Sequence, residues 1–244
     1  YSCCSRILRR FGEKIGYTNH FTIYDTDDSR RVMKQCQKQL GIEDKLINHK
    51  SILAEISRAK DSLISPEEYK QTAQNDFRKS KIAECYELYQ AQLKKSDAMD
   101  FDDIIFNTVK LLEENEDVRN LYQTQFKYVM VDEYQDTNHA QYVLTSLLAD
   151  KYKNICVVGD DDQSIYRFRG ATIENILSFE NHYKGSKVIR LEENYRSTQN
   201  ILDGANAVIS HNKNRKGKTL FTRSGSGDKI VYKTVMSESR SRST

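Results

Sequence analysis

Two apolar segments of this chain each end in a run of acidic residues, and a helical segment separates them. The first, residues 126–136, reads FKYVMVDEYQD, and the second, residues 154–163, reads NICVVGDDDQ. A strand followed by a helix and a second strand folds with a right-handed crossover, which makes the two strands parallel. Carboxylates at the end of a buried strand lose solvation energy without adding packing, so they indicate a site for a cation or a phosphate. The chain is therefore constrained to form a parallel sheet with a polar carboxyl edge.

The remainder of the C-terminal half continues this alternation. Runs rich in β-branched residues at 127–131, 154–158 and 187–191 are separated by helical segments near 138–149 and 172–183. Because strands and helices alternate throughout, the pattern predicts an α/β fold built on a parallel sheet.

The N-terminal half carries helical signals instead. Within residues 29–114, apolar side chains recur at the four-residue spacing of a helix face. The sole proline, Pro66, follows Ser65, and this pair is typical of a helix start. We expect a helical domain here, preceded by a short helix over residues 5–11.

The C-terminal part of the chain is basic. Residues 204–244 hold nine Lys or Arg against two acids. This skew fits a polyanionic partner, and it equally fits a solvated basic tail. A helix with Ser197 as its N-cap and a short strand at 230–235 are expected before a disordered end at 237–244.

The composition is typical of a soluble intracellular protein. Of the 244 residues, 38% are apolar, which can supply a core. No run approaches the roughly 18 apolar residues that a membrane helix requires, and no signal peptide is recognised. The five cysteines are odd in number and never spaced C-x-x-C, which argues against disulfides or a zinc site.

Asp132 and Glu133 are the first candidate site residues. Adjacent acids at the edge of a sheet can divide the work of hydrolysis. Asp132 can hold Mg²⁺, directly or through water, while Glu133 orients and deprotonates the attacking water. The alternative is structural, because acids complement the dipole of a helix that begins near residue 138, and Asp136 or Thr137 could cap it.

The loops after the next two apolar runs combine polar and aromatic residues. Gln163 can sense a phosphate by hydrogen bonding, and Tyr166 and Phe168 can stack on bases. The alternative is a charged loop whose aromatic rings are buried in the core. After the third run, Arg196 can reach a phosphate and Tyr195 can lie against a purine, although Tyr-Arg-Ser is also an ordinary turn into a helix.

Together these strings, in their order and spacing, resemble motifs II, III and IV of the UvrD/PcrA/Rep family of superfamily 1 DNA helicases. The resemblance implies part of a RecA-like P-loop NTPase sheet with an α-helical insertion domain. It implies that Asp132 binds Mg²⁺ and that Glu133 is the catalytic base. It further implies that Gln163 senses the γ-phosphate of ATP, that Arg196 is the arginine finger and that Tyr195 stacks on adenine.

The resemblance also implies contacts with single-stranded DNA. Tyr166 and Phe168 would stack on bases, and Arg169 would lie near the nucleotide. The family usually has Gly-Trp-Arg-Gly where this chain has Arg-Phe-Arg-Gly. Phe168 therefore offers a smaller ring, and Arg167 offers an additional phosphate contact.

Residues 99–104, MDFDDI, resemble the family segment in which the helical insertion rejoins the core. Phe101 is therefore another stacking candidate, the alternative being a buried helix residue. The resemblance predicts an end of the first RecA-like segment at 1–14, a helical insertion at 15–98, a RecA-like domain with motifs II, III and IV at 99–196, the start of a second motor domain at 197–236 and a disordered tail at 237–244.

The sequence contains no G-x-x-x-x-G-K-[ST] loop to hold phosphates. Gly217, Lys218 and Thr219 match only its end, because Asn212 stands where the first glycine is required and a helix precedes it. We expect the family's loop to lie upstream of Tyr1 and most of the second motor domain to lie beyond the chain. The isolated chain is expected to be inactive.

The first hypothesis is a fragment of an ATP-dependent 3′ to 5′ DNA helicase, with ATP and Mg²⁺ as cofactors and single-stranded DNA and single/double-strand junctions as partners. Such an enzyme would translocate on one strand and unwind duplex DNA in the cytoplasm, associated with a bacterial nucleoid. The second hypothesis is a non-catalytic DNA-binding or interaction module derived from such a helicase. A third, an acidic surface without a nucleotide role, leaves the order of the three motifs unexplained.

Overall fold

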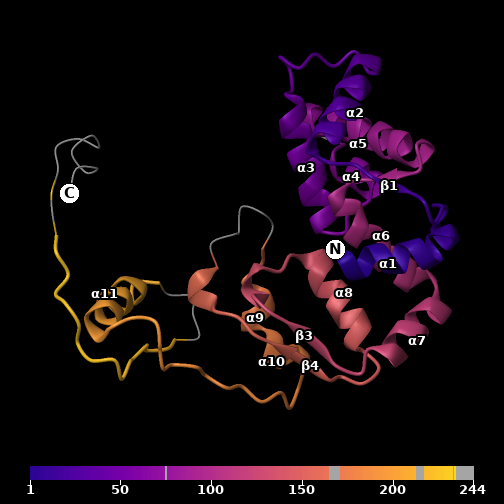
Figure 1. Cartoon of the computed structure of the whole chain (residues 1–244). Helices are drawn as coiled ribbons and strands as arrows, with labels where there is room; N and C mark the ends of the chain where they lie inside the picture. The colour runs from indigo at the N-terminus through magenta and orange to yellow at the C-terminus, as the bar shows by residue number, and fades with distance from the viewer. Residues whose placement is uncertain (75, 165–170, 213–216, 233, 235–244) are drawn as a thin grey trace. The chain divides into compact units, whose positions relative to one another are not determined.

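The chain has an α/β fold with short parallel sheets, and it divides into two compact units, residues 1–179 and residues 180–244 (Figure 1). No described helix is both long enough and apolar enough to cross a membrane. All five cysteines are free thiols. The structure, a computed structural model, describes residues 1–74, 76–164, 171–212, 217–232 and 234.

The described residues of the first unit begin with seven α-helices, which confirms the helical signals of the N-terminal half. A 3₁₀ turn, η1 (Gly12–Ile15), follows the first helix. The helices α1 to α7 are Ser2–Phe11, Thr26–Gln39, His49–Asp61, Pro66–Thr72, Phe77–Lys95, Phe101–Glu114 and Glu116–Gln125.

Local sequence signals explain where these helices start. Ser65 caps α4 as expected: its hydroxyl accepts from the Glu68 N–H, the Glu68 carboxylate accepts from the Ser65 N–H, and Pro66 occupies the first helical position. Asp100 and Asp103 form the same reciprocal pair at the start of α6. Each pair satisfies backbone N–H groups that the first helical turn leaves without partners.

The apolar side chains of the first unit form two clusters. One is built from α2, α3 and α5 and includes Met33, Ile52 and Tyr89. The other is built from α1, α6 and α8 (His139–Ala149) and includes Leu8 and Leu112. Figure 1 shows α2 to α5 grouped on one side of α6 and the larger parallel sheet on the other.

Two short strands connect the helical group to the rest of the unit. β1 (Thr22–Ile23) and β2 (Ala98–Met99) are parallel neighbours, with Thr22 opposite Ala98. The backbone N–H of Thr22 donates to the Asp97 carbonyl at 2.9 Å. The chain therefore enters and leaves the helical group at one place.

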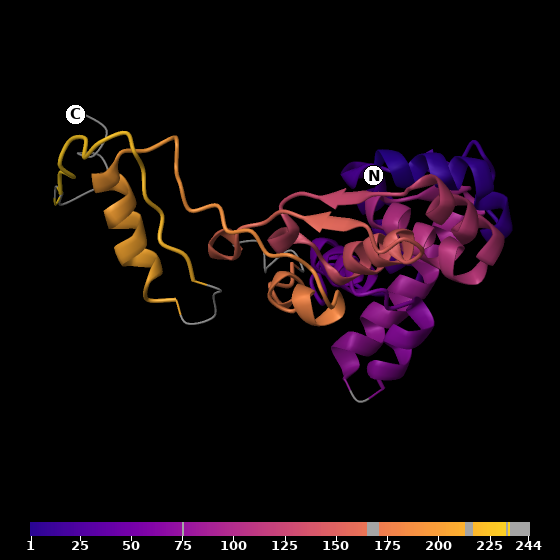
Figure 2. The same cartoon turned by 90° about the horizontal axis from the view of Figure 1, so that it is seen from below.

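The two acid-ended segments form the second parallel pair, which confirms the central expectation. β3 (Val129–Val131) and β4 (Ile155–Val157) lie side by side, with Val131 opposite Val157 (Figures 1 and 2). α8 connects them, as expected. Its N-cap is Asn138, which forms a capping box with Gln141, so the capping role suggested for Asp136 or Thr137 is wrong.

The expected third strand at 187–191 does not form. Val188, Ile189 and Leu191 are exposed, and no strand of the described residues pairs with this segment, so its backbone lacks the partner that a strand requires. Among the residues that the structure describes, one isolated bridge follows, between Glu193 and Phe221. The strand expected at 230–235 is likewise absent from its described residues.

Three helices complete the described chain. The helical segment expected near 172–183 is present as two short helices, α9 (Glu174–Leu177) and α10 (Phe179–His182). In the second unit, α11 spans Gln199–Ile209. Its N-cap is Thr198, so the expected cap at Ser197 is wrong by one residue.

Candidate active site

Asp132 and Glu133 lie at the carboxyl end of β3, beside the end of β4. Parallel pairing of Val131 with Val157 brings the residues that follow each strand to the same edge. Both acidic side chains are exposed. Oxygen ligands of this kind suit a hard cation such as Mg²⁺. The geometry thus provides the polar strand edge that the sequence predicted.

Glu133 has an unusual backbone conformation. Its φ of 50° and ψ of 44° lie in the left-handed region, which side chains with a Cβ rarely occupy. The Asp132 Oδ1 atom accepts from the Glu133 N–H at 2.9 Å, and the Glu133 carbonyl accepts from the Asp136 N–H at 2.9 Å. Such conformations persist only when the surroundings hold them, and they concentrate at functional sites.

Gln135 connects the two strand ends, and sequence reasoning missed it. Its side chain is only 1% exposed. Its Nε2 donates to Glu133 Oε2 at 2.7 Å, and its Oε1 accepts from the Asp160 N–H at 2.9 Å. A signal was present, because an amide can donate and accept at once and this one stands within the acidic run.

Gly159 allows this close approach. A Cβ at this position would lie 2.7 Å from Gln135 Oε1 and 2.8 Å from Ile176 Cδ1. The neighbouring Val158 carbonyl accepts from the Tyr134 N–H at 2.9 Å. The residues after β4 therefore pack directly against the 3₁₀ turn η2 (Tyr134–Asp136) that follows Glu133.

The loop after β4 turns through the 3₁₀ segment η3 (Asp161–Gln163). The Gln163 Nε2 donates to Asp160 Oδ2 at 2.7 Å, and the Asp162 N–H donates to Asp160 Oδ1 at 3.0 Å. One carboxylate oxygen from each of Asp160, Asp161 and Asp162 lies within 4.8 Å of the others. The exposed Gln163 amide therefore sits at the same edge as Glu133 and is joined to Asp160.

Asp136 adds a second acid beside Glu133. Partial burial and the Glu133 charge raise the pKa of its carboxyl. Its Oδ1 atom is buried and has no hydrogen-bond partner among the described residues. Buried polar atoms are normally paired, so this oxygen and the exposed Asp132 carboxylate are oxygen ligands that a cation could use.

Phe101, the separate candidate for base stacking, lies on the surface. It is the first residue of α6, it is 51% exposed, and its ring meets Tyr1 edge-on with centroids 5.9 Å apart. Ile104 and Ile105, later in the same helix, are buried. The alternative of a buried Phe101 is therefore wrong.

Tyr195 and Arg196 belong to the second unit. Tyr195 is 83% exposed, and its hydroxyl donates to Glu193 Oε2 at 3.2 Å. That hydrogen bond and the Glu193 charge raise the pKa of Tyr195. The Asn194 Oδ1 atom accepts from the N–H groups of Arg196 and Ser197, which forms the expected turn before a helix.

Four candidates lie outside the described residues: Tyr166, Arg167, Phe168 and Arg169. Their assignment to bases, phosphates and the nucleotide stays a prediction.

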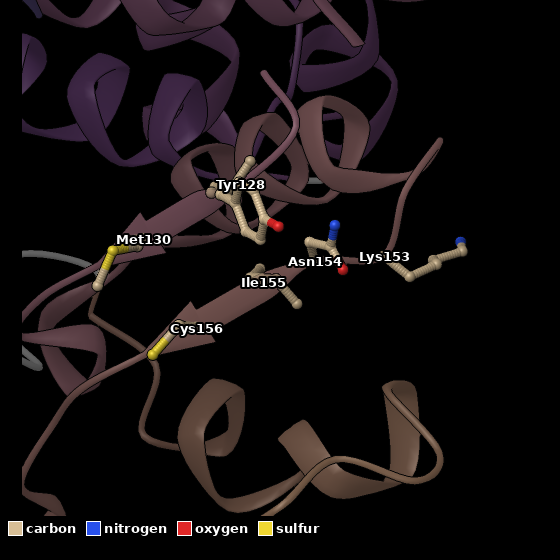
Figure 3. Close-up of a pocket in the computed structure, with 7 residues that line it drawn as sticks. Tyr128, Met130, Lys153, Asn154, Ile155 and Cys156 are labelled. Carbon is tan, nitrogen blue, oxygen red and sulfur yellow. The ribbon is translucent and has the colours of Figure 1, made fainter. Parts of the chain in front are cut away.

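A shallow pocket lies elsewhere on the same sheet. It is lined by residues of β3, β4 and the segments before them, including Tyr128, Met130, Asn154 and Cys156 (Figure 3). These residues lie within the strands or precede them, and none follows the carboxyl end of a strand. The pocket is therefore distinct from the edge that carries Asp132 and Glu133.

Comparison with known proteins gives two family matches. Residues 1–184 match the UvrD/REP helicase N-terminal domain, and residues 189–243 match the UvrD-like helicase C-terminal domain. Relatives named "ATP-dependent DNA helicase PcrA" include proteins from Staphylococcus epidermidis, 49% identical over 98% of this chain, and Bacillus subtilis, 48% identical over 95%. The chain spans 32% and 31% of those proteins. By sequence, the chain belongs to the UvrD/REP helicase family.

Proposed function

We propose that this chain is part of an ATP-dependent DNA helicase that moves 3′ to 5′ along single-stranded DNA and opens duplexes at single/double-strand junctions. The observation that carries the proposal is the pair of acids at the end of β3, joined through Gln135 to the loop after β4. The names of the relatives support the same activity. The parallel strands would then be part of a RecA-like sheet, and the whole protein would work in the bacterial cytoplasm.

At this edge, Asp132 would hold Mg²⁺, directly or through water. The ion, when bound, would neutralise charge on the phosphate oxygens of ATP. Glu133 would orient the attacking water and take its proton. The exposed Gln163 amide would hydrogen-bond the γ-phosphate.

Two further residues would contact ATP. Arg196 would donate to the phosphates as an arginine finger, and Tyr195 would stack on adenine. The high exposure of the Tyr195 ring supports a stacking role. Arg169 would lie near the nucleotide.

Single-stranded DNA would contact aromatic side chains of the first unit. Phe101 presents an exposed ring at a helix start, as stacking on a base requires. Tyr166 and Phe168 would stack on further bases, and Arg167 would contact a phosphate. Movement along DNA would come from changes in these contacts during hydrolysis.

The test is DNA-stimulated ATP hydrolysis by the full-length protein that contains this chain. We expect Glu133→Gln to reduce kcat by at least about 100-fold, because the carboxylate that accepts the proton is lost. Lys70→Gln, at an exposed ion pair of α4, is the control and should not change kcat. The 244-residue chain alone should hydrolyse no ATP. Unchanged hydrolysis in Glu133→Gln would contradict the proposal, and DNA binding without any ATPase activity would favour a non-catalytic module.

A further inference from the structure

A chain of hydrogen bonds runs from Glu133 to Gln163 through the buried Gln135 side chain. Glu133 Oε2 accepts from Gln135 Nε2 at 2.7 Å, and Gln135 Oε1 accepts from the Asp160 N–H at 2.9 Å. Asp160 Oδ2 in turn accepts from Gln163 Nε2 at 2.7 Å. The two ends of the chain are exposed, whereas Gln135 is 1% exposed.

The chemistry of its partners fixes the orientation of the Gln135 amide. A carboxylate only accepts, so the atom facing Glu133 must be the donor Nε2. A backbone N–H only donates, so the atom facing Asp160 must be the acceptor Oε1. Rotating the amide by 180° would break both bonds. Gln135 therefore holds the two strand ends in one relative position.

The packing around this amide leaves little room for adjustment. Gly159 approaches so closely that an added Cβ would lie 2.7 Å from Gln135 Oε1. On the other side, Glu133 keeps a left-handed backbone that requires restraint. A shift of the loop after β4 would thus be passed to the Glu133 carboxylate through Gln135.

We propose that Gln135 is a positioning residue that sets the location of the Glu133 carboxylate according to the position of the loop that carries Gln163. The inference rests on the proposed function, in which Glu133 takes a proton from water and Gln163 contacts the γ-phosphate. In this proposal the buried Gln135 side chain acts through Glu133 and not on ATP itself. Through Gln135, the Glu133 carboxylate takes its catalytic position only when the loop that carries Gln163 is also in position.

The experiment uses two substitutions in the full-length protein. Gln135→Met keeps the length and volume of the side chain but removes both hydrogen bonds. Gln135→Asn keeps the amide but is one methylene too short to reach both partners. We expect each to lower kcat for DNA-stimulated ATP hydrolysis by about 10- to 100-fold, while KM for ATP stays within about threefold, because misplacement of the base affects the chemical step more than binding.

The matched control is another buried glutamine. Gln123 is 6% exposed, and its Nε2 donates to the Leu147 carbonyl at 2.7 Å, between α7 and α8. Gln123→Met should lower the melting temperature without changing kcat per folded molecule. If Gln135 were only structural, its substitutions would behave in the same way, and that result would overturn the inference.

A double-mutant cycle gives a second readout that does not depend on stability. We compare the fold-loss of kcat caused by Gln163→Ala in two backgrounds. In the Gln135→Asn background this fold-loss should be at least about three times smaller than in the unchanged protein, because the hydrogen bonds that connect Gln163 to Glu133 are already broken. If the kcat loss of the double variant equalled the product of the two single-variant losses, the inference would be overturned. Activity retained by Glu133→Gln would instead contradict the proposed function, so the two failures are distinguishable.

Discussion

The Lys60 ammonium lies 2.6 Å from the Asp100 carboxylate, and both side chains are buried. Asp103, also buried, lies 2.9 Å from the same ammonium. Tyr89 donates to Asp100 Oδ2 at 3.0 Å, and Gln90 donates to Asp103 Oδ1 at 3.0 Å. One cation thus joins the end of α3 to the start of α6, directly beside Phe101.

Removing this cation should strongly destabilise the protein. Lys60→Met leaves two buried acids without a counter-charge, and we expect a loss of about 3–5 kcal/mol in the free energy of unfolding, measured by urea denaturation. The triple variant with Asp100→Asn and Asp103→Asn should recover most of that loss. Lys70→Met, at an exposed ion pair, should have little effect. Equal stabilities of the two single variants would contradict the prediction.

Asp61 should make stability depend on pH. Burial, followed by the nearby Asp102 charge, raises the pKa of Asp61 to about 7, above the roughly 3.9 of an unfolded chain. Between these values the folded state binds more protons than the unfolded state, so stability falls as pH rises from about 4 to about 7.

Asp61→Asn should remove that fall while keeping the oxygen that accepts from Asn138 Nδ2 at 2.6 Å. After discounting for solvent screening, we expect the variant to be about 1–2 kcal/mol more stable at pH 8 and equal to the parent below about pH 4. Urea denaturation across this range measures the difference. A difference that does not change with pH would exclude Asp61 as the source.

Gly159 should not tolerate a methyl group. Gly159→Ala would place a Cβ 2.7 Å from Gln135 Oε1 and 3.2 Å from the Tyr134 nitrogen, and we expect a loss of about 1–3 kcal/mol on thermal unfolding. Gly12→Ala is the control, because its Cβ would meet nothing closer than 3.5 Å and its φ is −58°. It should be neutral or stabilising by up to about 1 kcal/mol.

The left-handed backbone of Glu133 should reverse the usual order of alanine and glycine. Glu133→Gly should be about 1 kcal/mol more stable than Glu133→Ala, because only glycine adopts this conformation without strain. Urea denaturation of both variants measures the difference. The order expected in an ordinary helix, with alanine more stable, would show that the strain is absent.

Phe101 should contribute to DNA binding and little to stability. Phe101→Ala should weaken binding of single-stranded DNA by the full-length protein by about 1–3 kcal/mol, measured by fluorescence anisotropy. Phe77 is a matched control, since it is also the exposed first residue of an Asp-capped helix. Phe77→Ala should leave DNA affinity unchanged, and equal effects of the two substitutions would contradict a stacking role.

The sequence predicted elements whose signals are local. The apolar runs that became β3 and β4, and the Ser65–Pro66 helix start, each carry their own pattern. The run at 187–191 carries the same strand pattern but does not form a strand. A strand also requires a neighbouring strand to pair with, and the pattern of a segment does not show whether such a neighbour exists. The caps at Asn138 and Thr198 differ from expectation by one or two residues, since several neighbouring polar residues could serve.

The residues of the candidate site likewise differ in whether local sequence signals reveal them. Asp132, Glu133 and Gln163 could be recognised from residue type and position after a strand. Gly159 could not be recognised, and the position of Gln135 within an acidic run was only a weak signal. The importance of both residues arises from contacts between segments about 25 residues apart in the chain. Domain boundaries and the roles of individual site residues stay predictions.

The pairing of Thr22 with Ala98 has a consequence for how such a protein could evolve. The chain leaves the core at β1 and returns at the adjacent strand β2. A recombination event could therefore exchange the whole helical cassette, α2 to α5, while altering only two junctions. Helical cassettes of different length would be compatible with an unchanged core. One requirement would remain, since any replacement must bring a cation to the Asp100 and Asp103 carboxylates, as Lys60 does now.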